Sequence, residues 1–222
     1  QRNIPGVRGT SRLSPYLRFG EISPKTIWHV SKDYSNPGTD HFVREVGWRE
    51  FSYHLMANFP FLANKPLREN FEQFPWRDSD EDYEAWTKGM TGYPIVDAGM
   101  RELYATGWMH NRVRMIVSSF LVKHLLIDWR KGERWFFDTL LDGDFCSNNA
   151  GWQWVSGGGA DAAPYYRIFN PILQGKKFDT GGRYVRKWVP EIADIPNANL
   201  HAPWELSEGQ LQLFGIKLGE TY

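Results

Sequence analysis

Residues 109–126 decide the fold class of this chain and read MHNRVRMIVSSFLVKHLL. Their apolar side chains recur every three or four positions, the spacing of one face of an α-helix. That face comprises Val113, Ile116, Val117, Phe120, Leu121 and His124. The other side carries Asn111, Arg114, Met115 and Ser118. The stretch therefore predicts a helix with one core face and one polar face.

Helical spacing recurs in residues 24–32, 39–58, 81–88, 94–106 and 131–141. Patterns that alternate like a strand are nearly absent, so we expect an all-α domain with long ordered loops. Two of those loops are expected at residues 64–82 and 142–171, which are rich in polar and turn-forming residues. Residues 174–222 are less periodic, and we expect them to wrap the helical core.

Length and composition limit the possible functions. A chain of 222 residues with 41% hydrophobic content can form one well-cored domain, so we expect residues 1–222 to be a single unit. Lys plus Arg and Asp plus Glu both total 26, so a polyanion must be held by a local patch. The 11 tryptophans are more than core filling requires, because each indole N–H needs a partner.

Several classes of site are excluded by the residues themselves. The only cysteine is Cys146, and the six histidines show no metal-binding spacing, so we expect no metal site. Gly157, Gly158 and Gly159 lack the spacing of a dinucleotide-binding loop. No apolar run is long enough to span a bilayer, which favours a cytoplasmic protein that does not contact membranes.

Two helices combine arginine with polar and aromatic side chains on a face outside the core. The residues concerned are Glu45, Trp48 and Arg49 on one helix and Asn111, Arg112, Arg114 and Met115 on the other. If those faces meet, they line a cleft. Asp142 and Asp144 could pair with a buried Arg114, although a plain structural salt bridge explains the same residues equally well.

The turn Thr10-Ser11-Arg12-Leu13-Ser14-Pro15 offers hydroxyls, loop amides and one guanidinium, which are donors suited to a diphosphate. An ordinary capped turn is the alternative. From the residues alone we predict a helical domain with a polar, aromatic-rich cleft for a flat, partly anionic ligand. The residues alone do not indicate a reaction.

Three motifs carry a resemblance to a known family. They are GTSRLSP at residues 9–15, TGYPIVDAGMRELYATGWMHNRVRM at 91–115 and DGDFCSNNAGWQW at 142–154. REVGWREF at 44–51, LVKHLLIDWRKGE around Trp129 and DAAPYYRIFNPILQGKKFD at 161–179 extend the match over nearly the whole chain. The sequence closely resembles the photolyase and cryptochrome family, most of all a class I cyclobutane pyrimidine dimer photolyase.

The resemblance implies an all-helical domain that binds FAD, which is reduced in the active state. The matching cofactor positions are Thr10, Ser11, Arg12, Leu13, Ser14, Arg49, Asn111, Arg114, Asp142, Asp144 and Asn148. Asn148 matches the residue that faces flavin N5. That residue is asparagine in the repair enzymes and aspartate or cysteine in cryptochromes, so asparagine favours repair.

The resemblance also implies a site for ultraviolet-damaged DNA. The lesion-pocket positions are Glu45, Trp48, Asn111, Met115 and Trp154, and we expect Arg112 and Arg167 to contact backbone phosphates unless they are merely surface arginines. Trp76, Trp129 and Trp152 match a three-tryptophan electron relay. Without the resemblance, these three would be read as large core residues.

The predicted function is light-driven repair of pyrimidine dimers, a lyase reaction driven by electron transfer from reduced FAD to a flipped-out dimer. A cryptochrome-type photoreceptor without repair activity is the alternative, and an empty scaffold is a third. We expect a monomeric domain truncated at both ends. In that case the chain lacks the N-terminal α/β domain that binds an antenna chromophore, and it lacks an aromatic FAD contact upstream of Gln1. We therefore expect this domain to bind no antenna chromophore.

Overall fold

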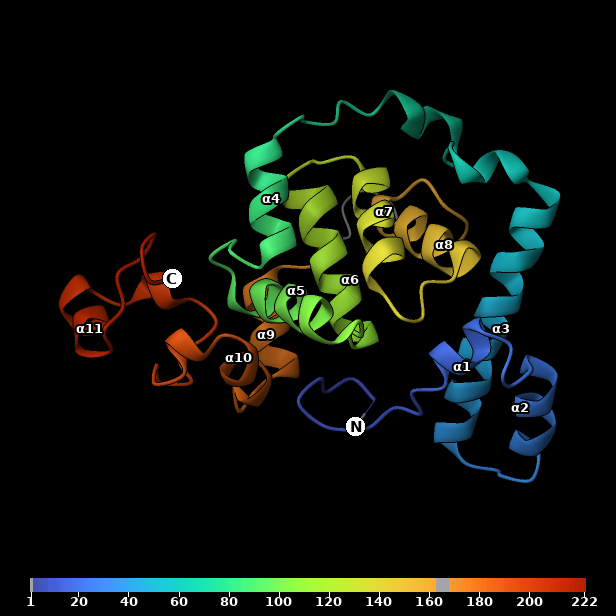
Figure 1. Cartoon of the computed structure of the whole chain (residues 1–222), viewed down its shortest axis with the longest axis horizontal. Helices are drawn as coiled ribbons and strands as arrows, with labels where there is room; N and C mark the ends of the chain where they lie inside the picture. The colour runs from blue at the N-terminus through green and yellow to red at the C-terminus, as the bar shows by residue number, and fades with distance from the viewer. Residues whose placement is uncertain (1, 163–167) are drawn as a thin grey trace. The chain divides into compact units, whose positions relative to one another are not determined.

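The computed structural model describes residues 2–162 and 168–222 (Figure 1). Within these ranges every regular element is helical, and the only β-type pairing is an isolated bridge between Arg77 and Ile127. The predicted all-α fold is therefore confirmed. In the same ranges no helix is both long enough and apolar enough to cross a membrane.

The chain divides into two compact units. Unit 1 comprises Gln1–Thr10, Trp76–Trp129 and Tyr165–Tyr222. Unit 2 comprises Ser11–Pro75 and Arg130–Pro164. The predicted site residues are distributed over both units, and the prediction of one domain over residues 1–222 stays a prediction.

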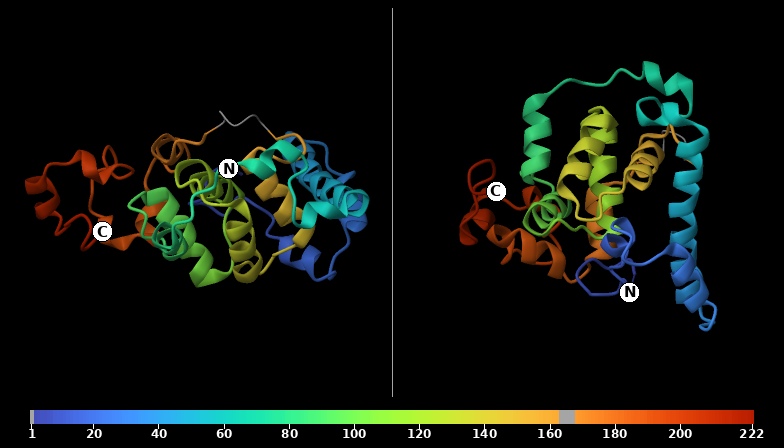
Figure 2. Two further views of the ribbon diagram at one scale, coloured as in Figure 1. Left: turned by 90° about the horizontal axis from the view of Figure 1, so that it is seen from above. Right: turned by 45° about the vertical axis from the view of Figure 1, so that its right-hand side comes forward.

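Unit 1 is built around a buried central helix, α5 (Pro94–Thr106), which packs against four neighbours. These are α4 (Asp80–Lys88), α6 (Asn111–Ser119), α9 (Pro171–Phe178) and α10 (Arg183–Trp188). Figures 1 and 2 show α5 beside α6. The remaining elements are η3 (Phe120–His124), η4 (Pro190–Ile192), η5 (Pro203–Glu205) and α11 (Glu208–Leu213).

Unit 2 is organised along α3 (Pro37–Asn58), the longest helix of the described chain. α3 packs against α2 (Pro24–Ser31), α8 (Phe145–Ser156) and η1 (Pro60–Ala63). The other elements are α1 (Ser14–Arg18), η2 (Glu69–Gln73) and α7 (Trp129–Thr139), whose first residue belongs to unit 1. The turn of η2 lies inside the loop predicted at residues 64–82.

Capping signals placed several helices correctly. Ser23 caps α2 by accepting a hydrogen bond from the Thr26 amide at 3.0 Å, and Pro24 occupies the first helical position. α5 spans the predicted residues, with Gly107 in the left-handed conformation that ends it. α3 begins two residues before the predicted start, because Asn36 is the cap and Pro37 follows it.

The helix predicted at 109–126 is shorter and changes character. The side chain of His110 caps it by accepting a hydrogen bond from the Arg112 amide, so α6 begins at Asn111. After Ser119 the chain forms a single π-type turn, η3, and it leaves the helix before Leu126, whose φ is +58°. Periodicity could not show this because the apolar pattern continues through the turn.

The prediction of a loop through residues 142–171 was wrong, because α8 occupies Phe145–Ser156. Its buried residues include the polar side chains of Asn149 and Gln153. Both donate to the carbonyl oxygen of Leu62, at 2.9 and 3.0 Å. Because amides rather than aliphatic side chains occupy the buried face, the helix has no hydrophobic periodicity to detect.

Candidate functional site

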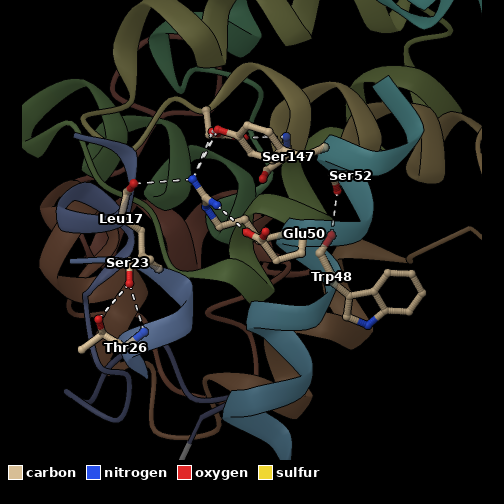
Figure 3. Close-up of polar contacts among 10 residues, drawn as sticks. Leu17, Ser23, Thr26, Trp48, Glu50, Ser52 and Ser147 are labelled. Atoms are coloured by element: carbon tan, nitrogen blue, oxygen red, sulfur yellow. Dashed lines mark hydrogen bonds and ion pairs between the residues drawn. The ribbon is translucent and has the colours of Figure 1, made fainter. Parts of the chain in front are cut away.

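Arg49 and Asp144 form the centre of a charged cluster in unit 2, and Figure 3 labels three residues that interact with them, Leu17, Glu50 and Ser147. Arg49 Nη2 lies 3.9 Å from Asp144 Oδ2, and the hydroxyl of Tyr53 also donates to Asp144. The Arg49 guanidinium lies over the Tyr53 ring, 4.7 Å from its centroid, and Nη2 reaches the Leu17 carbonyl oxygen at 3.5 Å. Two predicted cofactor residues are thus brought together, with α1 beside them.

Burial and hydrogen bonding define the charges of this cluster. Burial raises the pKa of Asp144, but hydrogen bonds from Tyr53 and Ser147 and the charge of Arg49 leave that pKa below the usual 3.8. Burial, followed by the hydrogen bond to Asp144, raises the pKa of Tyr53 to about 12. Near neutral pH the aspartate is therefore ionised and the tyrosine hydroxyl keeps its proton.

The predicted phosphate-binding turn is connected to the same cluster. Leu13 is the unassisted N-cap of α1, and its amide bonds the Ser11 hydroxyl at 3.4 Å. Arg12 has a φ of +56°, a left-handed conformation that costs energy for any residue with a side chain. At the other end of α1, Arg18 Nε donates to the Gly143 carbonyl oxygen at 2.7 Å, between Asp142 and Asp144.

α8 carries three of the predicted functional residues on one rigid element. Asp144 caps it by accepting a hydrogen bond from the Ser147 amide at 2.8 Å. Asn148, in its first turn, donates from Nδ2 to the Glu133 carbonyl oxygen at 2.8 Å. Trp152 is buried and packs edge-on against Phe136 at a centroid distance of 5.0 Å.

The third functional residue on α8, Trp154, is half-buried. Its indole Nε1 donates to the carbonyl oxygen of Asp161 at 3.1 Å. Asp161 has a φ of +50°, a second unfavourable left-handed residue next to a predicted site position. The Asp161 backbone thereby orients the Trp154 ring.

Glu45 and Trp48 are exposed on α3, three residues apart and therefore on one side of the helix. In Figure 3 the Trp48 indole points away from the side of α3 that faces Leu17. Trp48 is 49% exposed and makes an edge contact with Phe51 at 5.7 Å. An exposed indole beside a carboxylate is suited to stacking on a base and accepting a hydrogen bond from its edge.

The site residues of unit 1 surround the start of α6. Asn111 is exposed at its first position, and Arg114 donates from Nε to the Met109 carbonyl oxygen at 2.8 Å. Arg112 is half-buried, lies over the Phe178 ring at 4.5 Å, and donates to Asn3 Oδ1 and Met115 Sδ. Its guanidinium is thus held in place by side-chain contacts and is not a freely solvated surface group.

Two of the tryptophans predicted to form the relay also belong to unit 1. Trp129 is buried at the start of α7, and Trp76 is half-buried next to the bridged residue Arg77. Thr10 is exposed at the end of its segment. Arg167 lies outside the described residues, and the predicted pairing of Arg114 with the aspartates would join the two units, so both stay predictions.

Two members of the cluster were not predicted as site residues. They are Tyr53 and Arg18. No local signal identifies Arg18, because its partner Gly143 is 125 residues away in sequence. For Tyr53, the signal was available: it lies four residues after Arg49, one helical turn away.

A family model described as the FAD binding domain of DNA photolyase matches residues 42–222. The chain belongs to this family. Membership confirms the resemblance and the predicted photolyase-type FAD-binding helical domain. The matched region contains α3, α6 and α8, which carry most of the site residues described above.

Individual relatives agree with this family. The chain is 55% identical to the deoxyribodipyrimidine photo-lyase of Agrobacterium fabrum, with 100% of this chain and 47% of that protein aligned. It is 45% identical to cryptochrome-2 of Arabidopsis thaliana, over 96% of this chain and 37% of that protein. A bacterial class III photolyase structure from Agrobacterium tumefaciens has a TM-score of 0.95 at 54% identity, covering 100% of this chain and 47% of that one. The chain spans about half the length of the curated photolyases it matches.

Proposed function

We propose that this chain takes part in light-driven repair of cyclobutane pyrimidine dimers in DNA, by electron transfer from reduced FAD to a flipped-out dimer. The observation that carries the proposal is the arrangement at the start of α8. Asp144, paired with Arg49, caps the helix, and Asn148 follows one turn later with its amide anchored on the Glu133 carbonyl. A rigid amide is thereby presented beside a group of charged donors and acceptors.

The residues of unit 2 fit a phosphate-bearing flavin cofactor. Ser11, Arg12 and Ser14 offer hydroxyls and a guanidinium, and the left-handed Arg12 turns the backbone just before the start of α1, which has no side-chain cap. Arg49 adds a second guanidinium that is fixed by Asp144. Bound FAD would supply the light-excited electron for repair.

The protein's own residues would bind and orient the lesion. Trp48 and Trp154 present indole faces on which an unstacked pyrimidine can rest, and the Glu45 carboxylate can accept a hydrogen bond from the edge of a base. Asn111 and Met115, on α6 of unit 1, are the other residues that the resemblance assigns to the lesion. Arg112, and Arg167 if it is placed similarly, would hold backbone phosphates.

A photoreceptor without repair activity is the second candidate, favoured by the 45% identity to a plant cryptochrome. Asn148 argues for repair, since the resemblance associates asparagine at this position with the repair enzymes. The assignment to class I rests on the motif residues alone, and a structure titled class III matches the whole chain. Class therefore belongs to the proposal and not to the family assignment.

To test this proposal, the visible absorption spectrum of the purified chain is first measured before and after addition of FAD. The protein is then reduced and illuminated with ultraviolet-irradiated oligothymidine. A flavin band with light-dependent loss of dimers supports repair. A flavin band without repair favours the photoreceptor, and the absence of a band contradicts cofactor binding by this chain.

A matched pair of variants assigns the lesion pocket. Glu45→Gln keeps the shape but removes the charged acceptor, so dimer affinity should fall by about 1.5–3 kcal/mol, or roughly 10- to 150-fold. Glu208→Gln, at an exposed glutamate of α11, is the control and should bind like the parent. Parental affinity in Glu45→Gln would remove Glu45 from the pocket.

A further inference from the structure

The only β-type pairing in the described residues lies between two predicted relay tryptophans of unit 1. The Arg77 amide donates to the Leu126 carbonyl oxygen at 2.8 Å, and Arg77 and Ile127 form a parallel bridge. Trp76 directly precedes Arg77, and Trp129 follows Ile127 by two residues. Both tryptophans are therefore anchored through their backbones to the same short pairing.

Leu126 holds this pairing in an unfavourable conformation. Its φ of +58° lies in the left-handed region, which a leucine adopts at an energetic cost. The residue follows the π-type turn of η3, and the next amide, that of Ile127, bonds back to the Leu121 carbonyl oxygen at 3.1 Å. Hydrogen bonds on both sides thus hold Leu126 in a conformation that turns its carbonyl toward Arg77.

The side chain of Arg77 adds little to the pairing. This side chain is 53% exposed, and its guanidinium bonds Asp82 at 3.2 Å and the Leu125 carbonyl oxygen at 3.5 Å. Exposed ion pairs of this kind contribute little to stability. The main-chain bond between Arg77 and Leu126 is therefore the part that constrains the two segments.

We propose that Leu126 and Arg77 are positioning residues, whose backbone clamp sets the separation of the Trp76 and Trp129 indoles. The inference rests on the proposed function and concerns photoreduction, the separate step that would prepare its reduced FAD, in which light-excited oxidised flavin is the oxidant and the tryptophan relay supplies the electron. Trp129 gives up one electron toward the flavin and regains one from Trp76, and a soluble thiol then reduces Trp76. Electron transfer between aromatic rings slows steeply with separation, so a loosened clamp slows the step without a change to either indole.

Valine and glycine at position 126 test the clamp. Leu126→Val stays apolar but disfavours a positive φ, whereas Leu126→Gly adopts it readily. We expect Leu126→Val to lose hydrogen-exchange protection at the Arg77 amide and to slow flavin photoreduction several-fold. Leu126→Gly should retain both. Leu125→Val makes the same side-chain change at a φ of −84°, which valine tolerates, and should match the parent.

A second variant guards against misfolding of Leu126→Val. Arg77→Pro removes the donor N–H from the other side of the bridge and should slow photoreduction in the same way. Parental photoreduction in a folded variant whose Trp76 segment has lost protection would overturn the proposal. So would full protection of the Arg77 amide in Leu126→Val.

Failure of the relay itself can be told apart from failure of the clamp. Trp76→Phe and Trp129→Phe should each block photoreduction while sparing repair by chemically reduced protein, and parental photoreduction in both would contradict the relay assignment. The exchange measurement needs no cofactor. It therefore still reports whether Leu126 holds the bridge.

Discussion

Arg18 donates from Nε to the carbonyl oxygen of Gly143 at 2.7 Å, which joins the end of α1 to the turn between Asp142 and Asp144. This contact holds the phosphate-suited segment at residues 11–14 near the charged cluster through a helix of five residues. Together with the bond from Arg49 to the Leu17 carbonyl oxygen, it connects α1 to the charged cluster.

The first prediction concerns that bond. Arg18→Met keeps most of the side-chain length but removes the guanidinium, so FAD affinity should fall by at most about 10- to 150-fold, the equivalent of roughly 1.5–3 kcal/mol for one hydrogen bond to a charged group. Arg134→Met, at an exposed arginine of α7, is the control. Titration of both variants with FAD by fluorescence measures the effect, and equal affinities would count against a role for Arg18.

Tyr53→Phe should weaken the charged cluster by removing a hydrogen bond to Asp144. At neutral pH the hydroxyl is protonated and donates to Asp144, because burial and that bond raise the pKa of Tyr53 to about 12. Its removal should lower the free energy of unfolding by about 0.5–1 kcal/mol, since Tyr53 is partly exposed. Urea unfolding at pH 7 measures this.

The effect of Tyr53→Phe on stability should also depend on pH in the acidic range. The pKa of Asp144 is lowered in the folded protein, so its contribution to stability is complete above the unfolded value and is lost as the pH falls through the folded value. Without the Tyr53 donor the folded pKa should rise. The difference in stability between parent and Tyr53→Phe should then shrink below about pH 4. A constant difference down to pH 2 would show that the bond does not depend on the aspartate charge.

Trp154→Phe should separate lesion binding from cofactor binding. Phenylalanine keeps a stacking face but loses the Nε1 donor that the Asp161 carbonyl oxygen orients. We expect weaker binding of ultraviolet-irradiated oligothymidine with unchanged FAD affinity. Trp28→Phe, at an exposed indole of α2, provides the control. If both variants bind damaged DNA like the parent, Trp154 does not contact the lesion.

We expect the buried side chain of His201 to make the protein less stable in mild acid. Burial lowers the pKa of His201 below its usual 6.5, more than its bond to the Asp179 carbonyl raises it. Below about pH 6.5 the unfolded chain therefore binds more protons than the folded chain. As the pH is lowered, this histidine reduces the free energy of unfolding by at most about 1.4 kcal/mol per pH unit. His201→Gln should flatten the decline between pH 7 and 5, whereas His29→Gln, at an exposed site, should not.

Two glycines should respond oppositely to alanine. A Cβ at Gly99 in α5 would lie 2.4 and 2.9 Å from methyl groups of Val113 and Val117, so Gly99→Ala should destabilise unit 1 by about 1–3 kcal/mol. Gly47 in α3 has nothing within 4 Å, and Gly47→Ala should stabilise by about 0.5–1 kcal/mol. Thermal unfolding of the two variants tests the pair.

How much of the fold could be predicted depended on where the buried faces are apolar. α5 was placed correctly because Pro94 and Gly107 mark its ends and its buried face is mostly aliphatic. α8 was missed because buried Asn149 and Gln153 satisfy the Leu62 carbonyl instead of filling a hydrophobic core. The π-type turn before Leu126 was invisible for the opposite reason, since its apolar pattern is uninterrupted.

The residues of the candidate site could be predicted from the sequence, but the hydrogen bonds that join them could not. Arg49 and Asp144 were both assigned to the cofactor by resemblance, and their ion pair lies within one unit. The bonds made by Arg18 and the Asp161 carbonyl involve a backbone oxygen as acceptor. Every residue except proline has the same amide and carbonyl, so no choice of residue type marks such a contact in advance.

Asp144 has a consequence for how variants of this chain are interpreted. Its carboxylate starts the helix on which Asn148, Trp152 and Trp154 lie, and these three residues have different proposed roles. A change at Asp144 would therefore be pleiotropic, disturbing cofactor chemistry, the electron relay and lesion binding together. A screen that measures only repair would rank Asp144 among the residues that take part in the reaction. Its contribution would instead be to fix where α8 begins.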